Sequence, residues 1–227
     1  MAIVVVILLI LALVFVPGIW VQRVLARYSE PADRYSGTGA ELARLLLNKN
    51  GLADVLVEPT ESGDHYDPND KAVRLTQDKF DGRSLTAITV AAHEVGHAIQ
   101  DSLAYGPLRL RSRLVRIAIP IQKLGAGILM VSPFIGAITR VPQLGILMFG
   151  AGFLTLATTT LVHLVTLPTE FDASFGRALP MLDRHDILMP VDRPHARRLL
   201  TAAALTYVAA SLMSLLNIAR WWAILRH

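Results

Sequence analysis

Two histidines and a glutamate in the segment AAHEVGHAIQ have types and spacing that suit metal chemistry. His93 and His97 are four residues apart, so on a helix both imidazoles lie on one face and can bind the same zinc ion. Glu94 follows His93 directly and flanks the metal. From there it can take a proton from a water molecule that zinc activates and pass it to a leaving amine. The pattern predicts a hydrolytic zinc site.

A zinc site of this kind needs a third protein ligand, and the chain has no cysteine to supply one. No histidine stands six residues after His97, where Leu103 lies, so the ligand must come from elsewhere. Glu170 in LPTEFDASFGRAL is the best candidate, because it follows directly on an apolar run that can return the chain to the same side of a membrane. Without a third ligand, the alternative interpretation is that the two histidines are polar residues on an ordinary amphipathic helix.

The composition indicates that a bilayer is the solvent for much of the chain. Of 227 residues, 53% are hydrophobic, and the mean hydropathy is +0.46. The net charge of +4 comes from arginines beside apolar runs and not from a basic face studded with aromatic residues. We therefore expect no nucleic-acid partner, and we expect attraction to anionic lipid headgroups.

Hydropathy predicts a mainly α, polytopic helical membrane protein with about four transmembrane helices. Four crossings would bring the polar regions 22–113 and 168–198 to one side, and their arginines place that side in the cytoplasm. The expected location is the inner cell membrane, in multi-pass form. The whole chain, residues 1–227, is predicted to be a single membrane metallopeptidase domain. The predicted transmembrane helices span residues 2–21, 114–138, 142–167 and 199–218.

The larger polar region is predicted to be zincin-like, with a small β-hairpin before the active helix. Thr38 and Glu41 have the spacing of a capping box at the start of a helix over 39–50. The segments ADVLVEP and KAVRLTQ predict two short strands on either side of the turn DHYDPND. This hairpin either pairs with an extended substrate or serves only as a cover. The helix that carries the histidines is expected over 84–103.

Several segments together resemble the YugP-type membrane zinc metallopeptidases, which are related to the HtpX and CAAX-processing prenyl proteases. The resemblance covers nearly the whole chain. It implies one zinc ion per chain, bound by His93, His97 and Glu170, with Glu94 as the general base. Its segments are AAHEVGHAIQ, TGAELARLLL, DHYDPNDKAVRL, LVTLPTEFDAS and AAALTYVAASL.

Ser174 departs from this pattern, because HtpX-like relatives carry aspartate at that position. Asp101 and Asp172 are each either a partner for a zinc-binding histidine or a solvated carboxylate. His163 lies within an apolar run and either has a function or reaches water near a helix end. The donor that stabilises the oxyanion of amide hydrolysis is left open among four residues: His65, Tyr66, Arg177 and Tyr207.

Two functions follow from these patterns. The first is an integral-membrane zinc metalloendopeptidase that hydrolyses peptide bonds at the membrane surface, with peptides or membrane proteins as substrates and a role in membrane-protein turnover. The second is a non-catalytic membrane scaffold or assembly partner with a structural or vestigial zinc site. The sequence assigns no oligomeric state.

Overall fold

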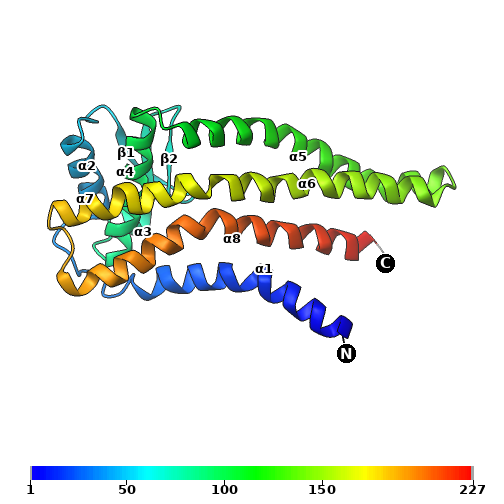
Figure 1. Ribbon diagram of the computed structural model, residues 1–227, viewed down its shortest axis with the longest axis horizontal. Coiled ribbons are helices and arrows are strands. Elements are labelled where there is room, and N and C mark those ends of the chain that lie inside the picture. The colour runs from blue at the N-terminus through cyan, green and yellow to red at the C-terminus, as the bar shows by residue number, and fades with distance from the viewer. Residues whose placement is uncertain (1, 226–227) are drawn as a thin grey trace. The chain divides into compact units, whose positions relative to one another are not determined.

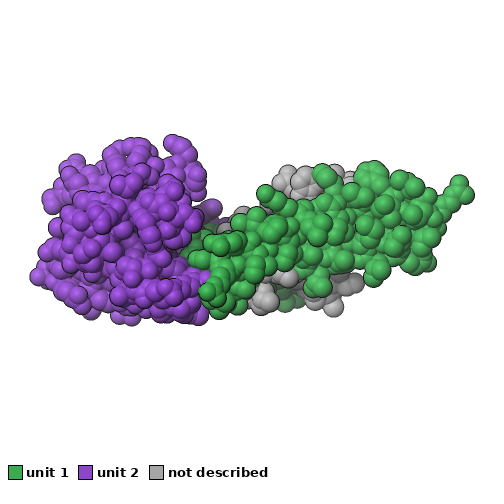
Figure 2. Space-filling view, turned by 90° about the horizontal axis from the view of Figure 1, so that it is seen from above, with its two compact units in different colours: residues 1–18, 110–166, 207–227 green, residues 19–109, 167–206 purple. Residues whose placement is uncertain are grey.

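The computed structural model describes the backbone of residues 2–225 (Figure 1). Inside the helices, some side chains lie outside the description: those of residues 2, 3, 6, 7, 10, 122, 156–161, 163, 164, 210, 211 and 213–225. Figure 2 colours two compact units, which we describe separately. Residues 19–109 and 167–206 form the sheet unit, and residues 2–18, 110–166 and 207–225 are the described part of the helix unit.

Long helices form where the sequence has apolar runs, and each contributes residues to both units. Proline occurs inside three of these helices, at positions 17, 120, 133 and 168, and the helices continue past it. Each proline removes one backbone hydrogen bond, and the remaining bonds of a long helix are enough for the helix to continue. The long helices are α1 (Ala2–Arg27), α5 (Gly106–Ile138), α6 (Pro142–Phe171) and α8 (Arg193–Leu225).

The prediction of about four transmembrane helices is wrong. Over the described residues, only α5 is long and apolar enough to cross a bilayer. In α6 the described apolar part is Pro142–Thr155, which rises about 21 Å and falls short of a hydrocarbon core of roughly 30 Å. The predicted multi-pass arrangement, which required several crossings, is not supported either. The cytoplasmic placement loses its basis, because it depended on four crossings.

A three-stranded sheet replaces the predicted hairpin. The strands are β1 (Leu56–Thr60), β2 (His65–Asp67) and β3 (Ala72–Thr76), in the order β1-β3-β2. The first predicted strand, β1, pairs with β3 in parallel, so it is not the hairpin partner. That partner is β2, which lies inside the segment predicted as a turn and pairs with β3 antiparallel.

Shorter helices complete the sheet unit. The helix α2 (Gly39–Lys49) begins with the predicted capping box: Thr38 Oγ1 accepts from the Glu41 N–H, and Glu41 Oε2 accepts from the Thr38 N–H. The other short elements are α3 (Gln77–Phe80), the π-helix η1 (Asp172–Ala178), α7 (Leu179–Arg184) and the 3₁₀ turn η2 (Pro190–Asp192).

The core of the sheet unit surrounds α4 (Leu85–Ser102), the helix that carries the histidine motif (Figure 1). It contacts α2, β3 and η1, so elements distant in sequence cover it from several directions. Fully buried side chains on these neighbours include Leu46, Leu47, Val73 and Leu75. The helix is therefore positioned by its packing along its length, which is what a precise site requires.

Candidate metal centre

The helix α4 holds His93 and His97 in a buried, rigid setting. Ser84 caps its N-terminus by accepting a hydrogen bond from the Ala87 N–H. Every residue from Leu85 to Gln100 is buried. The two imidazoles lie one turn apart, with their ring centroids 4.8 Å from each other and their planes at 83°. The four-residue spacing thus places both rings on one face, as the sequence pattern predicts.

Glu170, from the end of α6, completes a group with the two histidines. Its Oε2 lies 3.4 Å from His93 Nε2 and 3.2 Å from His97 Nε2. One ligand atom from each of the three residues can be chosen so that all lie within 4.8 Å of one another. The exposed fractions are 3% for His93, 4% for His97 and 0% for Glu170. The structure therefore brings together the three residues singled out from the sequence as metal ligands.

Gly96 allows the segment after Glu170 to approach α4 closely. A Cβ at this position would lie 2.6 Å from the backbone oxygen of Ala173. The main chain of η1 therefore occupies the space that a side chain would need. The π-helix begins two residues after Glu170, and such wide turns are frequent at functional sites. The close contact at Gly96 holds the end of α6 beside the histidine face.

Each histidine uses its second ring nitrogen in a contact with the protein. His93 Nδ1 lies 3.0 Å from Ser174 Oγ, and His97 Nδ1 lies 2.9 Å from Gln100 Oε1. Ser174 therefore contacts a zinc-motif histidine although it is not an aspartate. Sequence reasoning missed Gln100, for which the available signal is its place three residues after His97 on the same helix.

Asp101 does not partner a histidine of the motif. It accepts a hydrogen bond of 2.9 Å from the Tyr66 hydroxyl and forms an ion pair with Lys71. Burial, followed by the bond to Asp101, raises the pKa of the Tyr66 hydroxyl. Of the two interpretations of Asp101, the structure does not show the one in which it partners a zinc-binding histidine, because Gln100 and Ser174 contact the Nδ1 atoms of the two histidines.

The Asp172 carboxylate forms hydrogen bonds with two side chains. It accepts hydrogen bonds from Gln100 Nε2 at 2.8 Å and from Arg177 Nε at 3.2 Å. It contacts the site indirectly, through Gln100, and not through a histidine of the motif. Arg177, one of the candidate oxyanion donors, is engaged by this carboxylate.

The remaining candidates from the sequence have other contacts or lie outside the description. His65 Nδ1 is 2.8 Å from the backbone oxygen of Gly63. Tyr207 belongs to the helix unit, where the Arg111 guanidinium lies 4.6 Å from its ring centroid. The side chain of His163 is outside the described residues. None of these positions identifies an oxyanion donor.

Glu94 is buried on α4 next to His93, with 6% of its surface exposed. Its place in the chain puts it about 100° round the helix from His93, so it flanks the face on which the imidazoles lie. A carboxylate in this position is of the type that takes up and returns protons.

The donor set fits zinc. Two imidazole nitrogens and one carboxylate oxygen are ligand types that zinc accepts, and three protein ligands leave a fourth tetrahedral position for water or substrate. All three residues are buried, so little water can compete with a metal ion for their ligand atoms. These residues could hold one zinc ion in the arrangement that catalytic sites use.

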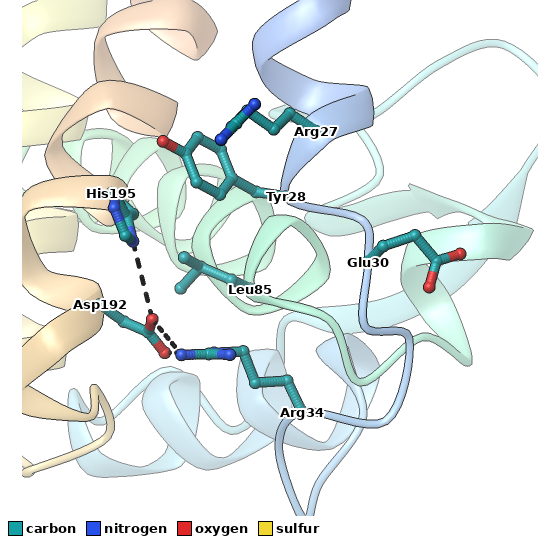
Figure 3. Close-up of a pocket in the computed structure, with 7 residues that line it drawn as sticks. All are labelled: Arg27, Tyr28, Glu30, Arg34, Leu85, Asp192 and His195. Atoms are coloured by element: carbon teal, nitrogen blue, oxygen red, sulfur yellow. Dashed lines mark hydrogen bonds and ion pairs between the residues drawn. The ribbon is translucent and has the colours of Figure 1, made fainter.

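A separate pocket of the sheet unit contains none of these residues (Figure 3). Its volume is about 370 Å³. Asp192, on one wall, accepts bonds of 2.6 Å from both Nε and Nη2 of Arg34, and a bond of 2.7 Å from the Tyr35 hydroxyl. Burial raises the pKa of Asp192, but the hydrogen bonds from Arg34 and Tyr35 outweigh this effect and hold that pKa below its ordinary value. The carboxylate serves as a charged anchor at the start of α8.

Comparison with known proteins confirms the resemblance seen in the sequence. The model of the family described as "Putative neutral zinc metallopeptidase" matches residues 2–226. The chain is also 39% identical, over 198 residues, to "Putative membrane protease YugP" of Bacillus subtilis (strain 168), which covers 86% of this chain and 84% of the relative. No solved structure matches. With its group of His93, His97 and Glu170, the chain belongs to this zinc metallopeptidase family.

Proposed function

We propose that the protein is a zinc-dependent metalloendopeptidase that hydrolyses peptide bonds at a membrane surface. One observation carries the proposal: two imidazole nitrogens on α4 and a carboxylate oxygen from α6 converge in a buried group. Membership of the zinc metallopeptidase family supports the same reaction.

In this proposal His93, His97 and Glu170 hold one zinc ion per chain, and Glu94 is the general base. When bound, zinc supplies a Lewis acid that polarises a carbonyl group and lowers the pKa of water to about 7. Glu94 accepts the proton of the attacking water and returns it to the nitrogen of the leaving amine. The buried walls of α4 and η1 hold the reacting groups in place while the proton moves.

The edge strand β2 offers a way to align an extended substrate. Over the described residues, β2 pairs with β3 along one side only, since β3 lies between β1 and β2. A hydrogen bond from Tyr66 on this strand to Asp101 on α4 ties it to the helix that carries the histidines. A peptide that added to β2 as a further strand would therefore run beside that helix.

Association with a membrane is the second part of the proposal. The Bacillus relative is named as a membrane protease, and α5 is long and apolar enough to cross a bilayer. Large apolar side chains on α5 are exposed, including Ile117 at 58%, Leu124 at 65% and Ile138 at 78%. Exposed apolar surface of this kind marks a membrane or protein contact. Membrane proteins or peptides near the bilayer are the proposed substrates, and their turnover is the proposed role.

Replacing Glu94 with glutamine tests the catalytic assignment. The amide keeps the size of the side chain but cannot take up a proton, so cleavage of a test peptide should fall by about 10²–10⁴-fold or more while zinc stays bound. The matched control is Glu58→Gln, which removes a carboxylate that pairs with Arg74 at the sheet. Undiminished cleavage by the Glu94→Gln chain would remove Glu94 from its role.

The alternative of a non-catalytic scaffold had two grounds, the large apolar share of the chain and the serine at position 174 where relatives carry aspartate. The contact between Ser174 and His93 weakens the second ground, because the hydroxyl meets the imidazole at hydrogen-bond distance. The scaffold and the peptidase differ in one readout. A chain that binds zinc but cleaves no peptide, before and after the Glu94 change, would favour the scaffold.

A further inference from the structure

The hydrogen bonds behind the two imidazoles fix which nitrogen of each ring carries the proton. Ser174 has one hydroxyl proton, which it donates to the backbone oxygen of Leu200 over 3.1 Å. Its oxygen therefore accepts from His93 Nδ1–H over 3.0 Å. The proton of His93 is thus on Nδ1, and the lone pair of Nε2 faces Glu170.

Gln100 fixes which ring nitrogen of His97 carries the proton. Its amide nitrogen donates to the backbone oxygen of Thr169 and to Asp172 Oδ2, both over 2.8 Å. Both partners accept only, so the amide cannot be turned round without placing its oxygen against two acceptors. Gln100 Oε1 must therefore face His97, and it accepts from His97 Nδ1–H over 2.9 Å.

In the neutral rings these hydrogen bonds leave two nitrogen lone pairs directed at one carboxylate oxygen, at 3.4 Å and 3.2 Å. Three acceptors at such distances repel one another in a buried site unless a proton or a metal ion lies between them. The neutral partners Gln100 and Ser174 thus prepare the group to receive a metal ion before any metal arrives.

Gln100 has a second effect, on the position of Glu170. Its two donor contacts, to Thr169 and Asp172, are on either side of Glu170 in the chain. The side chain of Gln100 is fully buried, and it connects α4 to the junction of α6 and η1. One residue therefore orients a histidine and holds the backbone that delivers the carboxylate.

We propose that Gln100 and Ser174 are positioning residues of the zinc centre: Gln100 aims His97 and holds the Glu170 segment, and Ser174 aims His93. This inference rests on the proposed zinc site. Outer partners of metal-binding histidines typically change metal affinity by about 10–100-fold when they are removed. Gln100 acts on two of the three ligands, so its loss is expected to have the larger effect.

The test measures zinc affinity by competition with a chelator, on the full chain in mild detergent. Gln100→Met keeps the side-chain length and removes all three hydrogen bonds, and Ser174→Ala removes a single oxygen atom. Asp172→Ala removes only one contact of Gln100, and Asp101→Asn is the matched control on the same helix. Two further measurements accompany each variant: the unfolding midpoint of the zinc-free chain and the visible absorption spectrum with cobalt in place of zinc.

The expected order of zinc affinity has Gln100→Met weakest, by about 10–100-fold, and Ser174→Ala weaker than wild type by about tenfold. Asp172→Ala should lose less, and Asp101→Asn should match the wild type. The cobalt spectrum should change for the first two variants and not for the control. A purely structural role would lower the unfolding midpoint and leave affinity and spectrum unchanged, which would overturn the inference.

Failure of this inference can be told from failure of the proposed function. If the wild-type chain binds zinc and Ser174→Ala and Gln100→Met bind it as tightly, the positioning roles fall while the zinc site stands. If Gln100→Met does not fold, Ser174→Ala decides the role of Ser174, and Asp172→Ala, which removes one contact of Gln100, decides the role of Gln100. A wild-type chain that binds no zinc would overturn the proposed function and this inference with it.

Discussion

In each unit a glycine lets two segments approach closely, but the groups that come into contact differ between the two units. In the sheet unit Gly96 lets the backbone at Ala173 come near α4, and the result is a polar group held by several hydrogen bonds. In the helix unit Gly152 meets Leu129, with a Cβ position 2.7 Å from Leu129 Cγ, and the result is apolar packing between α5 and α6. Close approach at a glycine accompanies a buried polar group in the sheet unit and apolar helix packing in the helix unit.

The surroundings of these contacts explain the difference. The residues around Gly96 are buried, and Gln100 and Ser174 have hydrogen-bond partners that fix their orientation. The helices of the other unit expose large apolar residues, such as Leu124 and Leu147 at 65% and 70%. The sheet unit depends on the orientation of polar side chains, and the helix unit depends on apolar contact area. The same glycine-to-alanine substitution should therefore have different effects in the two units.

Gly96→Ala should have the largest effect. The added Cβ would lie 2.6 Å from a backbone oxygen, which cannot turn aside as a side chain can. We expect the free energy of unfolding to fall by about 1–3 kcal/mol. Zinc affinity should also fall at least about tenfold, because Glu170 moves away from the histidines. Thermal unfolding of the zinc-free chain and chelator competition measure the two effects, and unchanged zinc affinity would contradict the role of this contact.

Asp192→Asn should have an intermediate effect, visible in the dependence of stability on pH. The pKa of Asp192 lies below its ordinary value of 3.8, so its contribution is present above about pH 4 and is lost as the pH falls through the lower, native value. Asparagine removes that contribution, so the variant should be less stable at pH 7 and should lose less stability on acidification.

The measurement for Asp192 is the unfolding midpoint recorded from pH 7 down to about pH 2. The control is Asp54→Asn, since Asp54 is exposed in the same unit. An Asp192→Asn profile that runs parallel to the wild-type profile would show that Arg34 and Tyr35 do not hold this carboxylate as described.

Gly127→Ala, in the helix unit, should have the smallest effect and the opposite sign. An added Cβ at this position of α5 meets nothing within 4 Å. Alanine favours the helix over glycine, so the free energy of unfolding should rise by about 0.5–1 kcal/mol without any change in zinc affinity. A destabilised variant, in the same unfolding assay, would mean that this face of α5 is covered.

The sequence predicted those parts of the molecule that depend on local pattern. The spacing of His93 and His97 requires only a helix, and the capping box at Thr38 and Glu41 requires only a helix start. Glu170 was found because its segment is distinctive and follows an apolar run. These features need no knowledge of how distant segments pack.

The features that were missed depend on tertiary contacts. The strand β2 has three residues inside a turn-like segment, and only pairing with β3 makes it a strand. In the sequence nothing distinguishes Gln100 from other polar residues, and its role depends on its tertiary contacts with Thr169 and Asp172. The number of transmembrane helices was overestimated because apolar runs were counted in the sequence, whereas over the described residues only α5 is long and apolar enough to cross a bilayer.

The zinc content of the full chain, purified without chelator, is the most direct test of the account. The wild-type chain should carry close to one zinc ion, and Glu170→Gln should lose most of it, because a carboxamide replaces the carboxylate ligand. Retention of full zinc by a folded Glu170→Gln chain, or a wild-type chain without zinc, would contradict the claim that α4 and the end of α6 hold the metal together.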